Sequence, residues 1–141
     1  MSNSNTVQRA VEKKFSHVPN FRGPKALAKL GAPELDGAGD VIGGYYDDTL
    51  GRLTALIYDY AIVIHEEAAN DWLIIEYEDV LGCKLCHRET KQNAKTAVIH
   101  TPEHHYRVSI SGHRGNVRDV YDFIGLVGKI SLLRSTVNLP D

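Results

Sequence analysis

The chain has 141 residues, which is the length of one ordinary domain. Hydrophobic residues make up 43 % and charged residues 24 %, proportions that exclude a mainly disordered chain, a collagen-like repeat and a disulfide miniprotein. Sixteen Lys and Arg against eighteen Asp and Glu give a formal net charge of −2, whereas a dedicated nucleic-acid binder usually has a basic excess. We therefore expect one globular domain that does not bind nucleic acid.

The compartment is inferred from two features of the sequence. The first residues contain no basic segment followed by an apolar run, and no stretch approaches the roughly 18 consecutive apolar residues of a membrane-spanning helix. The only cysteines are Cys83 and Cys86, and in a chain without an export signal we expect both thiols to stay reduced. These features predict a soluble, cytoplasmic protein.

A helical lead-in is expected over residues 1–35. Apolar residues from Val7 to Phe15 recur at helical spacing, and a second helix is expected with Pro24 at its first position. The stretch 31–40 is rich in Gly and Pro, which is typical of a linker. One or two N-terminal helices should therefore precede the main body.

Residues 41–110 change to short β-branched and aromatic segments separated by polar turns, the pattern of antiparallel strands. Predicted strands cover 41–46, 51–58, 60–65, 72–77, 79–86, 96–100 and 105–110.

After Gly115 the apolar spacing becomes three and four residues, which predicts an amphipathic helix over residues 116–134. Asn116 is the expected N-cap, and Asp119 should lie beside the positive end of the helix dipole. We expect residues 135–141 to form a loose tail. The apolar stripe predicted for the helix consists of Val117, Val120, Tyr121, Ile124, Val127 and Ile130.

About seven antiparallel strands closed by one helix predict an α+β, mainly β domain, a partly open barrel or sandwich capped by the C-terminal helix. This order resembles a pleckstrin-homology-like (PH-like) domain, particularly the small bacterial ones, over roughly Asp36 to Leu133. The resemblance implies a PH-like domain over residues 36–134 and no single function, because such scaffolds host many roles. The segments that carry it are Asp40–Tyr45, Gly51–Ile64, Ile74–Leu81 and the C-terminal helix.

Cys83, Cys86 and His87 form the C-x-x-C-H string used for covalent haem attachment. Strand residues three apart point to opposite faces, so the two thiols should not reach one porphyrin edge. Zinc would need three or four converging ligands, and this chain has only one C-x-x-C half. We therefore expect ordinary strand cysteines, no cofactor and no metal.

Three histidines, His100, His104 and His105, surround a turn that contains a proline. With Arg107 or Arg114 they form the basis of an alternative function, a small hydrolase or transferase. No nucleophile elbow, Walker-type glycine loop or paired metal-binding histidines on a helix accompany them. The sequence therefore favours a protein without catalytic activity.

Some PH-like domains bind phosphoinositides through basic loops, but the corresponding loops here are acidic and should repel anionic head groups. The resemblance also implies an open corner and a sheet edge that can accept an added strand. We therefore predict a non-catalytic protein-binding module, an adaptor or inhibitor of phage-encoded or immunity type, with no membrane partner. Acidic loops can steer a basic protein partner, and neighbouring aromatic side chains can anchor it. The predicted partner-binding residues are Tyr45, Tyr46, Asp47, Asp48, Glu66, Glu67, Asp71 and Trp72.

Overall fold

The computed structural model describes residues 9, 20–33, 35, 37–66, 71–90, 92–112 and 117–138, with side chains of the last helix described as far as residue 132. Its elements, in chain order, are β1 (Phe21–Arg22), α2 (Pro24–Lys29), β2 (Val41–Asp47), β3 (Arg52–Tyr58), β4 (Ala61–His65), β5 (Trp72–Glu76), the short 3₁₀ turn η1 (Tyr77–Asp79), β6 (Gly82–Leu85), β7 (Thr96–His100), β8 (His105–Ser109) and α3 (Arg118–Asn138).

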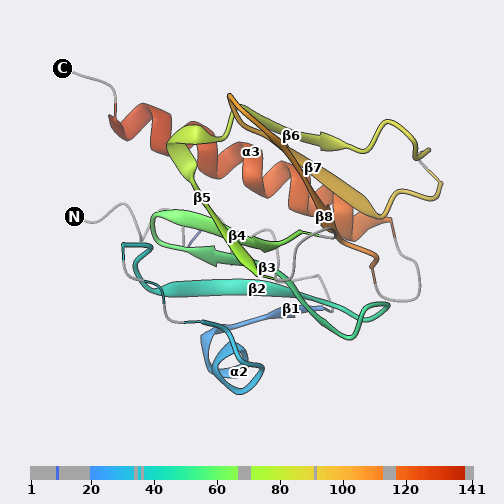
Figure 1. Ribbon diagram of the computed structural model, residues 1–141, viewed down its shortest axis with the longest axis horizontal. Helices are drawn as coiled ribbons and strands as arrows, with labels where there is room; N and C mark the ends of the chain where they lie inside the picture. The colour runs from blue at the N-terminus through green and yellow to red at the C-terminus, as the bar shows by residue number, and fades with distance from the viewer. Residues whose placement is uncertain are drawn as a thin grey trace.

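The strands form two antiparallel sheets. The first sheet has the order β1-β2-β3-β4-β5 and the second has the order β6-β7-β8 (Figure 1). The second sheet and α3 lie on one side of the first sheet, and α2 lies on the other (Figure 1). The predicted α+β, mainly β class is confirmed, with two packed sheets and no closed barrel among the described strands.

The central strands β3 and β4 are buried along almost their whole length because both faces of the first sheet are covered. One face packs on the second sheet and α3, and forms the main core around residues such as Ile62, Ile99 and Phe123. The other face forms a second cluster in which Leu27 of α2 packs with Leu56 and Val63. Burial on both faces explains why these strands are continuously apolar rather than alternating.

The segment before β2 packs on the body of the protein. β1 pairs with β2, and Leu27 of α2 is fully buried against the first sheet. The expected linker is also held in place, since the Tyr60 and Asp59 N–H groups donate to the Ala38 and Asp40 carbonyls. Of the two predicted N-terminal helices, α2 is present, and the earlier one falls outside the described residues.

The helix α3 differs from its prediction in length and in its buried face. It continues to Asn138, four residues into the segment expected to be a loose tail. Phe123 and Leu126 are fully buried, whereas Tyr121 is exposed and Ile124 only partly buried. The buried face is thus rotated from the predicted stripe toward Phe123, because α3 packs against β6, β7 and η1 together.

Candidate functional site

Two of the predicted partner-binding residues, Tyr45 and Asp47, are buried. One Asp47 carboxylate oxygen accepts hydrogen bonds from the Ser109 hydroxyl (2.6 Å) and the Ser111 N–H (3.0 Å), and the other accepts from the Leu50 N–H (3.0 Å). Burial alone would raise the pKa of Asp47, but these hydrogen bonds hold it below its usual value. Asp47 therefore joins β2 to the end of β8 and does not face a partner.

The Tyr45 side chain has a comparable internal role. Its hydroxyl donates to Asp119 at 2.7 Å and accepts from the Gly112 N–H at 2.8 Å. Burial and the neighbouring Asp119 carboxylate raise the pKa of Tyr45. Asp119 lies in the first turn of α3, as predicted, and from a buried position it also ties the start of α3 to β2. Asn116, the predicted N-cap, lies outside the described residues.

Five other predicted partner-binding residues lie at one end of the first sheet, where β2 turns into β3 and where β4 ends and β5 begins; they are Tyr46, Asp48, Glu66, Asp71 and Trp72. Asp48 and Asp71 are exposed, and Glu66 is half-buried. Tyr46 and Trp72 are also half-buried and pack at the margin of the second cluster. Glu67 falls outside the described residues.

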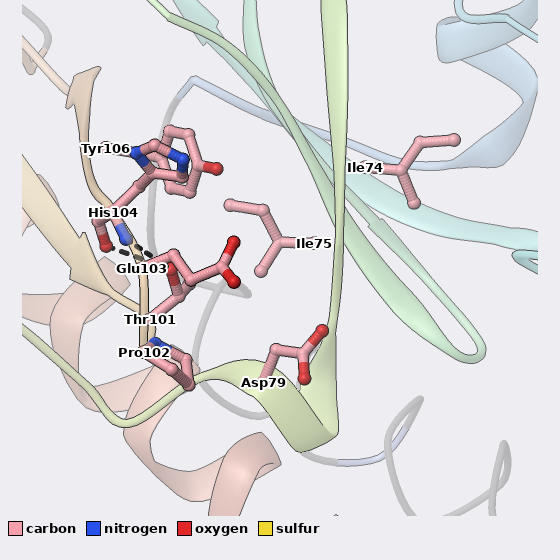
Figure 2. A pocket seen from close by; sticks show the side chains of 8 residues that line it. All are labelled: Ile74, Ile75, Asp79, Thr101, Pro102, Glu103, His104 and Tyr106. Carbon is pink, nitrogen blue, oxygen red and sulfur yellow. Dashed lines mark hydrogen bonds between the residues drawn. The ribbon is translucent and has the colours of Figure 1, made fainter.

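A cleft of about 300 Å³ opens between β5 and the turn that joins β7 to β8. Figure 2 shows Ile75 pointing into this cleft toward Tyr106, while Ile74 points away on the other side of β5. Asp79 lines the cleft from η1, and Glu103 lines it from the β7–β8 turn (Figure 2). The two sheets are held together at the opposite end of β8, where the Ser109 carbonyl accepts from Thr54 of β3 and the Ser109 hydroxyl donates to Asp47 of β2.

β5 is an edge strand: in the described part of the chain it pairs with β4 on one side only. Ile74, near its middle, is 51 % exposed. Carboxylates lie at both ends of the strand. A hydrogen bond with Glu78, and then repulsion by Glu78 and by Asp79, raises the pKa of Glu76. We call β5 and these carboxylates the acidic edge. Its carboxylates are Glu66 and Asp71 before the strand and Glu76, Glu78 and Asp79 at its end.

The structure separates the three histidines of the alternative function. His100 and His105 lie on the outer face of the second sheet with ring centroids 4.3 Å apart, whereas His104 lines the cleft beside Tyr106. Arg107 shares the outer face with His100 and His105, and Arg114 falls outside the described residues. No group of three or more His, Cys, Asp or Glu among the described residues is arranged to hold a metal.

Cys83 and Cys86 occupy different environments, as the strand geometry predicts. Cys83 packs against the main core, and burial raises the pKa of its thiol to about 12. Cys86 lies beside His87 in a hollow on the outer face of the second sheet. Both cysteines are free thiols.

No protein-family model, no curated protein and no solved structure matches this chain. Among the described helices, none combines the length and the apolar character needed to cross a bilayer. The site must therefore be interpreted from its own geometry.

The sequence led to the prediction that acidic residues at one end of the first sheet bind a partner, but it did not reveal the cleft or most of the acidic edge. Glu76, Glu78 and Asp79 are visible as an acidic group near a predicted strand. The sequence does not show that β5 is an edge strand or that Glu103 lies across the cleft from it, because both depend on how the strands and sheets pack.

Proposed function

We propose that this protein is a non-catalytic, PH-like protein-binding module whose acidic edge binds a basic, extended segment of a partner protein. The observation that carries the proposal is an edge of β5 that no other described strand pairs with, that borders a cleft and that has carboxylates at both ends. A role as a cytoplasmic adaptor or inhibitor agrees with this mode of binding. The PH-like assignment is supported by the order of elements over residues 36–134, in which β2–β5 of the first sheet precede β6–β8 of the second sheet and a C-terminal helix.

The edge supplies the backbone part of the interaction. An edge strand presents N–H and C=O groups that an extended peptide can pair with, and these hydrogen bonds supply affinity without specifying sequence. A peptide added to β5 would place alternate side chains on its two faces. One set would enter the cleft beside Ile75, and the other would lie beside the exposed Ile74.

Charge determines the kind of peptide. A peptide with Lys or Arg at alternate positions would bring cations to Asp79 and Glu103 at the cleft and to Asp71 at the start of the strand. Such cations would also relieve the repulsion that raises the pKa of Glu76. Complementary charge should accelerate association and make it depend on salt.

The test uses an eight-residue peptide of alternating Lys and Val, capped at both ends. Trp72 is the only tryptophan and is the first residue of β5, so its fluorescence reports binding at this edge. We expect saturable binding that weakens between low and high salt. The Glu78→Lys/Asp79→Lys variant should weaken it by about tenfold or more, since close charge pairs contribute 1.5 kcal/mol or more.

Two controls accompany this test. Asp122→Lys reverses a carboxylate on α3, and it should leave binding unchanged. A peptide methylated at every backbone nitrogen keeps its charge but loses the hydrogen-bond donors of both edges, and it should bind weakly. Equal binding of a Glu-Val peptide, an unaffected Glu78→Lys/Asp79→Lys variant, or full binding of the methylated peptide would each overturn the proposal.

A further inference from the structure

A second concave surface lies on the outer face of the second sheet, on the other side of the sheet from the main core. Strand alternation directs Ala97 and Ile99 of β7 into the core, and it leaves Val98 and His100 on the outer face. The hollow there has a volume of about 330 Å³, within the range of small-ligand pockets. We call it the basic hollow; its lining residues are Lys84, Leu85, Cys86, His87, Val98, His100, His105 and Arg107.

The register of the strands brings the charged side chains of the hollow together. Lys84 of β6 and Arg107 of β8 both pair with Val98 of β7, so the two long cationic side chains flank a short apolar one. Strands lie about 4.8 Å apart, so Lys84 and Arg107 start roughly 10 Å from each other and can reach over Val98 toward one group. The neighbouring row contains the His100–His105 pair, whose rings are 4.3 Å apart.

The lining is cationic and contains no carboxylate. His100 faces Lys84 from β6 and His105 from β8. Burial, then repulsion by His105 and by Lys84, lowers the pKa of His100 below its ordinary value. A cation in this hollow would meet the same repulsion, whereas an anion would relieve it.

We propose that the basic hollow binds a tetrahedral oxyanion, the phosphate or sulfate group of a small ligand, and that protonation of its histidines strengthens this binding. The planar guanidinium of Arg107 can donate two parallel hydrogen bonds to such a group, and the Lys84 ammonium adds a point charge. Protonated His100 and His105 add two further donors. The site is separate from the acidic edge, so it does not depend on the proposed partner-binding function.

The dependence on pH follows from linkage. An anion in the hollow favours the charged imidazoles, so binding takes up protons and tightens as the pH falls. His100 carries the larger part of this coupling, because its pKa is lowered in the free protein and an anion offsets the causes of that lowering. The groups that face it are Lys84 and His105, and both oppose a positive charge on His100.

Sulfate is the first probe, because its charge is constant between pH 5.5 and 8. The full chain is titrated with sulfate at fixed ionic strength while NMR follows the amides of β6–β8 and the histidine rings. We expect binding to be at least about fivefold tighter at pH 5.5 than at pH 8. Arg107→Gln and Lys84→Gln should each weaken it at both pH values, and His100→Gln should reduce the dependence on pH.

Arg52→Gln is the matched control, since it removes an exposed arginine at the start of β3. Methyl phosphate is also titrated at pH 8. Tighter binding of methyl phosphate than of sulfate indicates a phosphate ligand, and the reverse indicates a sulfate ligand. Glutarate, a dianion with planar carboxylates, should bind more weakly than either. Equal binding of glutarate, absence of sulfate shifts in β6–β8 at pH 5.5, or an effect of Arg52→Gln equal to that of Arg107→Gln would overturn the proposal.

Discussion

Asp47 lies at the corner where the two sheets are joined. Its carboxylate accepts hydrogen bonds from Leu50, Ser109 and Ser111, and a hydrogen bond from the Thr54 hydroxyl to the Ser109 carbonyl strengthens the same corner. The sequence separates Asp47 from Ser109 by 62 positions, so a local pattern shows only an acidic residue at the start of a turn. Sequence reasoning therefore placed Asp47 on a surface, although its partners make it a buried tie between sheets.

Replacement of this carboxylate tests its structural role. Asp47→Asn should lower the free energy of unfolding at pH 7 by about 2 kcal/mol, because hydrogen bonds to a charged acceptor weaken while the neighbouring donors stay buried. The pKa of Asp47 is lower in the folded protein than in the unfolded chain. Its stabilising contribution is therefore present above about pH 4 and is lost as the pH falls through the folded-state pKa.

Urea unfolding at pH 7 and at several values between pH 4 and 2 measures both effects. Asp71→Asn, at an exposed position just before β5, is the control and should cost little. If Asp47→Asn were as stable as the wild type at pH 7, the carboxylate would not hold the two sheets together.

At the scale of elements, the packing of α2 depends on a glycine in β2. A Cβ atom added at Gly44 would lie 2.9 Å from Leu27 Cδ2, 2.7 Å from Leu56 Cδ2 and 3.0 Å from the Ala55 carbonyl oxygen. The absence of a side chain at Gly44 thus lets α2 approach the sheet. The spacing of apolar residues and the positions of turn-forming residues predicted α2 and the later strands. The two-residue β1 is too short to show such a spacing. The contact between α2 and β2 was not predicted, because the spacing of apolar residues within one segment does not show which other segment it packs against.

A pair of substitutions tests this docking. Gly44→Ala should destabilise the protein by about 1–3 kcal/mol because it overpacks the interface. Leu27→Ala should cost about 2–5 kcal/mol because it leaves a cavity. In the double variant the Leu27 methyl no longer meets the added Cβ, so the combined loss should be at least 0.5 kcal/mol smaller than the sum, a typical coupling for residues in contact. Denaturant unfolding of all four proteins gives this coupling, and strict additivity would show that α2 does not pack on Gly44.

At the scale of the whole molecule, the second sheet separates two surfaces of opposite charge. His104 and Tyr106 lie on the side of the cleft, and the neighbouring His105 and Arg107 lie in the basic hollow. In the sequence these residues form one histidine-rich hairpin, which suggested a single site. Strand alternation divides them between two faces, and the packing of the sheets then places Glu103 near the acidic edge. The composition and strand pattern predicted the fold class, whereas both surfaces depend on register and sheet packing.

Amide hydrogen exchange of the wild-type protein, measured by NMR with and without the Lys-Val peptide, tests the central claim most directly. If the peptide adds a strand to the acidic edge, the β5 amides that have no partner on β4 acquire one and should exchange more slowly in the complex. Amides of β1 and β6, two of the strands at other sheet edges, should exchange at unchanged rates. Unchanged exchange throughout β5 at saturating peptide, or slowing confined to β1 or β6, would contradict partner binding at this edge.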